Sequence, residues 1–236
     1  MLDEKSLIKC FESADLPLDT HTAARLCGYA QMLIEKNKVM NLTAITDDEG
    51  IAIKHFADSI LPLTLVDFPQ NAKIADVGTG AGFPGIPMCI YRNDFRPVLI
   101  DSLKKRVNFL EEVCEKYLPS AVCVHSRAED AGRAEEYREQ FDAVVARAVA
   151  RLNVLCEYCL PFVKKGGMFV ALKGPDLSEE ARLAEKAVKM LGARIEKIIP
   201  YTLPNGEGRT VAVIRKVSDT PKKFPRQSAK IAKQPL

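Results

Sequence analysis

Four glycines, Gly78, Gly80, Gly82 and Gly85, lie within the segment Ala75–Pro87, whose sequence is ADVGTGAGFPGIP. A short apolar run precedes the segment, and a helix-like stretch comes after it. A strand that passes through a glycine-rich turn into a helix brings backbone N–H groups and a helix N-terminus close to a ligand. Three of the glycines also fit the G-x-G-x-x-G pattern of dinucleotide-binding folds. The turn therefore predicts a nucleotide-type ligand without naming it.

Asp76 is the residue that discriminates between the possible ligands. At the carboxyl end of the first predicted strand, its carboxylate is expected to point toward the ligand, where it would repel a pyrophosphate. It would attract the ammonium and sulfonium of S-adenosylmethionine, because unit charges about 4 Å apart interact by about 4 kcal/mol at an effective dielectric near 20. We therefore expect Asp76, Gly78 and Gly80 to bind S-adenosylmethionine. An NAD(P)-dependent oxidoreductase that uses the same turn is the alternative.

Acidic side chains also follow the next two predicted strands. Asp101 ends the second strand, about 20 residues beyond the glycine turn, where an acid can accept hydrogen bonds from both ribose hydroxyls. The alternative role for Asp101 is to cap the following helix. After the third strand comes Ser126-Arg-Ala-Glu-Asp130, in which Ala128 and Glu129 are expected to contact the edge of the adenine ring.

Cations end the fourth and fifth predicted strands: Arg147 in VVARAVAR and Lys173 in ALKGPD. The carboxyl ends of parallel strands face the ligand crevice of an open α/β sheet. We therefore expect these two residues to hold substrate phosphates or a base edge.

Strands alternate with helices from Phe68 onward. The predicted strands are Lys73–Val77, Pro97–Asp101, Ala121–His125, Phe141–Ala146, Met168–Leu172, Arg194–Thr202 and Thr210–Val217. The predicted helices are Pro84–Tyr91, Leu103–Tyr117, Glu129–Glu139, Leu152–Val163 and Ser178–Leu191. This alternation predicts an α/β fold with a mostly parallel sheet covered on both faces. The connection between the last two strands is too short for a crossover, which predicts an antiparallel hairpin.

Three parts are expected along the chain: an N-terminal helical cap (1–66), a Rossmann-like domain (67–218) and a basic tail (219–236). The overall charge of +3 is concentrated near the C-terminus. From Lys216 onward Asp219 is the single acid, against Lys216, Lys222, Lys223, Arg226, Lys230 and Lys233. Such a tail is typical of polyanion binding, and a solubilising end is the alternative.

The composition indicates an ordinary globular protein, with 47% hydrophobic and 28% charged residues among 236. No apolar run reaches the roughly 18 residues of a membrane span, and the N-terminus lacks the apolar core of a signal peptide, so we expect a cytoplasmic protein. Seven scattered cysteines indicate reduced thiols. Cys156 and Cys159 form a C-x-x-C pair within a predicted helix. Without a second pair we expect core packing and no metal site.

The chain resembles a known family in a series of blocks that occur in the same order. These are NKVMNLTAI, KHFADSILPL, DVGTGAGFPGIP, LIDSLKKRVNFLEEV, SRAED, ARAVA, ALKG, GRTVAVIRK and the basic tail. They look like the ribosomal small-subunit methyltransferase G family, also called glucose-inhibited division protein B. The resemblance implies a class I S-adenosylmethionine-dependent methyltransferase fold with a seven-stranded sheet. The family's donor-binding positions fall on Gly78, Phe83, Ala128, Glu129 and Arg147. An extra glycine precedes Arg209 relative to the usual family pattern.

The implied activity is methyl transfer to guanine N7 in the decoding-site loop of 16S ribosomal RNA. Guanine N7 carries a lone pair and no proton, so the transfer requires positioning and electrostatics rather than a general base. No catalytic base is therefore assigned, and Arg147, Lys173 and His55 are candidates for orienting the substrate. The implied partner is 16S rRNA or the small ribosomal subunit, with no membrane and no metal, and a monomer is expected. A non-catalytic RNA-binding module with the same fold is a further alternative.

Overall fold

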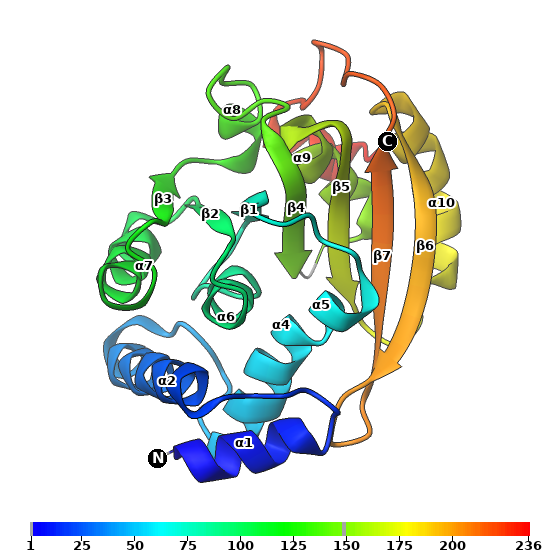
Figure 1. The fold of residues 1–236 in the computed structure, drawn as a ribbon. Coiled ribbons are helices and arrows are strands. Elements are labelled where there is room, and N and C mark those ends of the chain that lie inside the picture. Colours follow the sequence, from blue (N-terminus) through cyan, green and yellow to red (C-terminus); the bar gives the residue numbers. More distant parts are fainter. Residues whose placement is uncertain (1, 148–149) are drawn as a thin grey trace.

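The computed structural model describes residues 2–147 and 150–236, and within them seven strands form one sheet in the order β3-β2-β1-β4-β5-β7-β6 (Figure 1). The strands are β1 (Lys73–Val77), β2 (Arg96–Asp101), β3 (Val122–His125), β4 (Phe141–Arg147), β5 (Val163–Lys173), β6 (Ala193–Thr202) and β7 (Gly208–Lys216). β1 to β5 pair in parallel, whereas β7 pairs antiparallel with both β5 and β6. The predicted mostly parallel sheet with a C-terminal antiparallel hairpin is confirmed.

Successive side chains of the central strands enter two different cores, because a strand presents alternate residues to opposite faces. Ile74 of β1 belongs to one buried cluster and Ala75 to the other. The first cluster joins the sheet to α1 (Glu4–Glu12), α2 (Thr20–Met40), α6 (Gly85–Tyr91) and α7 (Lys104–Tyr117). The second joins it to α9 (Leu152–Cys159) and α10 (Ser178–Met190). The N-terminal helices thus share a core with the sheet.

The sheet reverses its order at β1, which lies between β2 and β4 while the chain continues outward on both sides. In open parallel sheets, ligands bind in the crevice outside the carboxyl ends of the strands at such a switch point. The carboxyl ends of β1, β2 and β4 place Val77, Asp101 and Arg147 at this edge.

The N-terminal cap turns toward this edge through an ordered loop. Asp19 caps α2 by accepting a hydrogen bond from the Thr22 amide at 2.7 Å, and the helix ends at Asn41, which is left-handed with φ of 50°. The chain continues through α3 (Asp48–Gly50), the π-helix η1 (Ile51–Ala57), α4 (Asp58–Ile60) and α5 (Pro62–Leu65). π-Helices are rare and occur often at functional sites.

The predicted helix Glu129–Glu139 is wrong, because α8 spans only Ala128–Ala131. Turns follow, and Glu139 has a positive φ of 55°. The Arg138 side chain donates to the Gly132 carbonyl at 3.1 Å and to the Thr220 carbonyl at 2.6 Å. The Glu139 amide donates to the Pro161 carbonyl at 2.8 Å, so its backbone hydrogen bond goes to a distant part of the chain rather than to a helical turn.

Two of the cations counted near the C-terminus, Lys216 and Arg226, are not free surface charges. Lys216 ends β7 and is 1% exposed, and Arg226 is paired with the buried Glu157. The segment after β7 forms a short helix, α11 (Ser228–Lys233), next to α9 (Figure 1). Lys222, Lys223, Lys230 and Lys233 remain exposed.

Candidate active site

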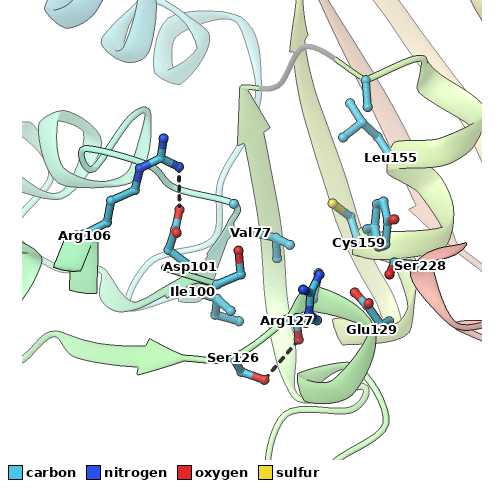
Figure 2. Close-up of a pocket in the computed structure, with 15 residues that line it drawn as sticks. Val77, Ile100, Asp101, Arg106, Ser126, Arg127, Glu129, Leu155, Cys159 and Ser228 are labelled. Carbon is cyan, nitrogen blue, oxygen red and sulfur yellow. Dashed lines mark hydrogen bonds and ion pairs between the residues drawn. The ribbon is translucent and has the colours of Figure 1, made fainter. Parts of the chain in front are cut away.

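Two cavities lie at the carboxyl ends of the strands, and residues near the end of β4 contribute to both. The first, about 300 Å³, is lined by residues that follow β1, β2 and β3 and by one side of α9 (Figure 2). The second, about 380 Å³, lies between the N-terminal cap and the ends of β4, β5 and the start of β7. We refer to them as the first and second cavities.

Asp76 shapes the glycine turn from inside the protein. It is 1% exposed, and its Oδ2 accepts hydrogen bonds from Thr79 Oγ1 at 2.6 Å and from the Gly85 amide at 2.7 Å. Among the described residues, Asp76 Oδ1 has no hydrogen-bond partner. Burial raises the pKa of this carboxyl to about 6. Asp76 does not line either cavity, so its contact with a ligand stays a prediction, while its role in closing the turn is direct.

Gly78 and Gly80 occupy different positions in the same turn. Gly78 has φ of +72° and lines the first cavity, and a Cβ there would meet no atom within 4 Å. A side chain at Gly78 would therefore extend into open space where a ligand can approach the backbone. Gly80 does not line the cavity, and its amide donates to Asp101 Oδ2 at 3.0 Å.

Asp101 lines the first cavity and also begins the following loop. Its side chain is 4% exposed, and Oδ1 accepts a hydrogen bond from the Leu103 amide at 2.9 Å. Arg106 Nη1 lies 3.6 Å from Oδ2, an ion pair drawn in Figure 2. The N-cap of α7 is Leu103, with no side-chain cap hydrogen bond, so the capping role of Asp101 is wrong, and its contact with the ribose stays a prediction.

Ala128 and Glu129, at the start of α8, line the opposite part of the first cavity. Glu129 is 7% exposed, and no hydrogen bond or ion pair involves its carboxylate within residues 2–147 and 150–236. Figure 2 shows Glu129 on the same side of the cavity as Cys159 of α9. A carboxylate without a protein partner in a cavity is a ready acceptor for ligand N–H or O–H groups.

His55, Phe83 and Arg147 form a stacked group beside the second cavity. The His55 and Phe83 rings lie 4.2 Å apart between centroids at 13°, and the Arg147 guanidinium carbon lies 4.9 Å from the Phe83 centroid. Arg147 Nη2 lies 3.2 Å from His55 Nδ1, which must accept because a guanidinium can only donate. His55 Nε2 therefore carries the proton and donates to Thr43 Oγ1 at 2.8 Å.

The electrostatics of this group keep His55 uncharged. Burial and the Arg147 charge lower the pKa of His55 to about 3. Thr43 is itself fixed by Asn37, whose Oδ1 accepts from the Thr43 amide at 2.9 Å. The neutral imidazole is thus held in one tautomer and one orientation.

Asp58 connects the cap to the sheet at the second cavity. Its Oδ2 pairs with Arg147 Nη1 at 3.0 Å, and its Oδ1 accepts from the Tyr201 hydroxyl at 3.0 Å. Arg209 Nε lies 3.4 Å from the same Oδ1. Arg147 Nη1 also donates to the Lys54 carbonyl at 2.9 Å, so one guanidinium joins η1, α4 and β4.

Lys173 lines the second cavity from the end of β5 and is paired internally. Its Nζ lies 2.8 Å from Glu180 Oε2 and donates to the Ala150 carbonyl at 2.9 Å. Glu180 also accepts from the Leu152 amide at 2.9 Å. Lys173 therefore holds the start of α9 in addition to contributing positive charge.

The structure brings the predicted site residues together in two groups and leaves three outside the cavities. Gly78, Asp101, Ala128 and Glu129 line the first cavity, and His55, Arg147 and Lys173 line the second. The three residues outside the cavities contact residues of these groups or of the glycine turn: Asp76 bonds to the turn, Gly80 to Asp101, and Phe83 stacks on His55. The lining residues that sequence reasoning missed include Lys54, Asp58, Arg106, Arg127, Tyr158 and Ser228.

The first cavity suits S-adenosylmethionine on three observations. Gly78 leaves open space at the backbone, and Asp101 and Glu129 supply acceptors for ribose hydroxyl and adenine N–H donors. The buried Asp76 carboxyl adds negative potential behind the turn when it is ionised, which favours the cationic part of the donor.

The remaining expectations concern membranes, metals and thiols. Along the described ranges, no helix has the length and apolar character required to cross a bilayer. No group of three or more His, Cys, Asp or Glu in those ranges is arranged to hold a metal ion. The seven cysteines are free thiols. Both members of the C-x-x-C pair are fully buried, which confirms the predicted core packing of that pair.

The fold is shared with solved structures that contain S-adenosylmethionine. A mutant of the 16S rRNA (adenine(1408)-N(1))-methyltransferase from Catenulisporales acidiphilia, solved with its cosubstrate SAM, aligns with a TM-score of 0.52 at 15% identity. That alignment covers 64% of this chain and 87% of that chain. TYW2 of M. jannaschii, in complex with AdoMet, aligns with a TM-score of 0.53 at 12% identity over 68% of this chain and 74% of that chain. The protein therefore has the class I methyltransferase fold.

The family model for rRNA small subunit methyltransferase G matches residues 22–204. Proteins named ribosomal RNA small subunit methyltransferase G are similar along most of the chain. The one from Desulforamulus reducens is 48% identical over 88% of both chains. The one from Acetivibrio thermocellus is 47% identical over 98% of this chain and 96% of the relative. The chain belongs to this family.

The chain is therefore an S-adenosylmethionine-dependent methyltransferase of 16S ribosomal RNA. The alternatives of an NAD(P)-dependent oxidoreductase and of a non-catalytic RNA-binding module are not supported.

Proposed function

We propose that this protein methylates guanine N7 in 16S rRNA, with the donor in the first cavity and the guanine in the second. When bound, the donor supplies a methyl group activated by a sulfonium. Gly78 leaves space for it, Asp101 accepts from its ribose and Glu129 accepts from its adenine. The observation that supports this arrangement best is that Arg147 of the second cavity lies over Phe83 in the glycine turn, whose Gly78 lines the first cavity.

The second cavity suits a guanine on a phosphate backbone because four cations line it. These are Lys54, Arg147, Lys173 and Arg209, with Asp58 as the acid that lines it beside them. Arginine and lysine donate to guanine O6 and to phosphate oxygens, and neither can accept a proton at neutral pH. We propose that Lys54, the most exposed of the four at 39%, contacts the backbone first.

The groups beside the second cavity leave methyl transfer without a base, as N7 alkylation requires. His55 Nδ1 faces a guanidinium, and the Asp58 carboxylate is held by Arg147, Tyr201 and Arg209. These residues orient the substrate and hold charge at fixed positions, which are the two contributions available to a reaction without proton transfer.

We propose a division of labour along the chain that follows the expected parts. Residues 1–66 contribute His55 and Asp58 to the substrate cavity, and residues 67–218 contribute the donor turn and the sheet. Residues 219–236 contribute exposed lysines. We further propose that the protein acts as a cytoplasmic monomer on rRNA or on the small subunit. Light scattering on the purified protein, with and without RNA, tests the monomer.

Methyl transfer from isotopically labelled S-adenosylmethionine tests the proposed function. The substrates are unmodified 16S rRNA and assembled small subunits, and borohydride–aniline cleavage maps N7-methylguanine. We expect one modified guanine and transfer that is lost in Arg147→Met. Lys164→Met, an exposed cation on β5 outside both cavities, is the matched control and should retain activity. Labelling of an atom other than N7 would contradict the proposal.

A further inference from the structure

The C-terminal segment, residues 217–236, is anchored by a buried cation at the end of β7. Lys216 Nζ donates to Thr220 Oγ1 at 2.7 Å and to Glu139 Oε1 at 2.9 Å. The Thr220 amide donates to the same Glu139 oxygen at 2.6 Å. The first residues of the segment are therefore fixed to the body of the protein, in contrast to a mobile charged tail.

A second anchor lies at Phe224, which is 2% exposed and packs in the cluster between α9 and the sheet. Arg138 Nη1 donates to the Phe224 carbonyl at 2.9 Å. Further along, Ile231 in α11 is fully buried, and Asn153 Nδ2 donates to the Leu236 carbonyl at 3.2 Å. The segment thus lies along α9 to its last residue.

The third anchor is a fully buried carboxylate in α9. Glu157 is 0% exposed, and its Oε1 accepts from the Arg226 amide at 2.9 Å and from Arg226 Nε at 2.8 Å. Its Oε2 accepts from Arg226 Nη2 at 2.6 Å. A buried charge that loses its partner is strongly destabilising, so this pair fixes the position of Arg226. Glu157 directly precedes Tyr158, which lines the first cavity.

Ser228 follows Arg226 by two residues and lines the first cavity together with Glu129, Tyr158 and Cys159. Figure 2 shows Ser228 on the same side of the cavity as Glu129 and Cys159. We infer that the C-terminal segment forms a wall of the methyl-donor cavity. Ser228 contacts the adenine-bearing part of the donor, and Arg226 and Glu157 are positioning residues for it. This inference rests on the proposed placement of the donor in the first cavity.

The chemistry of Ser228 suits this position. A hydroxyl both donates and accepts, so it matches an adenine edge, which presents a donor and acceptors side by side. The Glu129 carboxylate on the same side, when it is ionised, can accept hydrogen bonds but cannot donate them. The two side chains therefore offer complementary groups, and the segment, for which the sequence predicted polyanion binding, also contributes to the donor cavity.

Calorimetry of the full-length protein with S-adenosylhomocysteine tests the inference. Ser228→Trp places a bulky side chain in the first cavity, and Arg226→Met removes the ion pair with Glu157 that anchors the segment. Each should weaken binding about tenfold or more. Lys230→Met, an exposed cation in the same helix, is the matched control and should bind within about twofold of the wild type. Arg226→Lys should restore part of the affinity, because it keeps the charge opposite Glu157.

Limited trypsin cleavage at Lys222 and Lys223 provides a readout that a purely structural role would not change. S-adenosylhomocysteine should slow this cleavage in the wild type and have no effect in Ser228→Trp. If Arg226→Met fails to fold, Glu157→Gln combined with Arg226→Met leaves a neutral buried pair and is measured in its place. Normal donor affinity in a folded Ser228→Trp variant would overturn the inference.

Asp101→Ala separates failure of this inference from failure of the proposed function. If Asp101→Ala weakens donor binding while Ser228→Trp does not, the proposed contact between the C-terminal segment and the donor is overturned. The placement of the donor in the first cavity then stands. If neither variant changes the affinity, the donor lies elsewhere and both proposals are overturned.

Discussion

The guanidinium of Arg147 lies over the ring of Phe83, with its carbon 4.9 Å from the ring centroid. Phe83 belongs to the glycine turn, and Arg147 ends β4 and lines the second cavity. His55 stacks on the same ring. The donor turn and the cationic cavity are therefore mechanically connected by three side chains from distant parts of the sequence.

Phe83→Leu should remove the stacking contacts that link the glycine turn to Arg147 and His55. It keeps a buried apolar side chain but loses the aromatic face, which contributes about 0.5–1.5 kcal/mol beyond its area, and we expect methyl transfer to fall through misplacement of Arg147. Urea unfolding measures the loss of stability, and single-turnover kinetics measure the fall in the methyl-transfer rate. Phe95→Leu is the matched control, because Arg92 lies over that buried ring at 4.3 Å, away from both cavities. Equal transfer rates in the two variants would contradict a role for the ring.

His55 should make stability depend on pH below neutrality. Its pKa is about 3 in the folded protein and near 6.5 when unfolded, so the unfolded state takes up a proton first as the pH falls. The contribution of His55 to stability is nearly complete above pH 6.5 and is lost progressively toward pH 3, by about 2 kcal/mol at pH 5. Urea unfolding at pH 7 and pH 5 measures this loss. His55→Gln should lose correspondingly less over the same interval, and an equal loss would argue against a buried neutral imidazole.

Asp101→Ala should weaken S-adenosylhomocysteine binding by about tenfold or more while leaving RNA affinity largely unchanged. The variant removes the acceptor for the ribose and also the bonds to Gly80 and Leu103. Asp94→Ala, a surface acid paired with Arg92, is the comparison. Calorimetry measures donor binding, and filter binding measures RNA. Unchanged donor affinity would remove the ribose role.

The exposed lysines of the C-terminal segment should account for part of the salt dependence of RNA binding. Changing Lys222, Lys223, Lys230 and Lys233 to Gln should make the slope of log K against log salt less steep by up to about 3 units, because fewer counterions are released. Donor affinity should stay unchanged, in contrast to deletion of the segment. An equal-charge control changes Lys38, Lys105, Lys116 and Lys189. A slope identical to that of the wild type would reduce the lysines to a solubilising role.

Much of the sheet could be predicted from local patterns. Strand–helix alternation and the short final connection led to the seven strands and the terminal hairpin, because both are set by nearby residues. The predicted helix at Glu129–Glu139 was wrong because Arg138 bonds to the C-terminal segment, and the neighbouring sequence carries no signal for that contact. The ion pair between Glu157 and Arg226 could not be predicted either, because the two residues are far apart in the sequence.

The cavity-lining residues were easiest to predict where they end strands, whereas of the cap residues that line the second cavity His55 alone was predicted. Asp101, Arg147 and Lys173 were found because carboxyl strand ends meet at one edge. Asp58 was missed, although it lies three residues after His55 in a helical segment, a spacing that places two side chains on one face. The function itself followed from resemblance, since the second cavity is assembled from segments that no single motif joins.

The π-helix that carries Lys54 and His55 has a consequence for how this sequence can vary in length. A π-helical turn holds about one more residue than an α-helical turn, because its hydrogen bonds join residues i and i+5 rather than i and i+4. Deleting one residue between Ile51 and Ala57 would return the turn to α-helical winding and leave the residues after it in register. The residues within the turn would shift instead, and Lys54 and His55 would lose their contacts with Arg147. A single deletion here would therefore preserve the helix and Asp58 while it changed the lining of the second cavity.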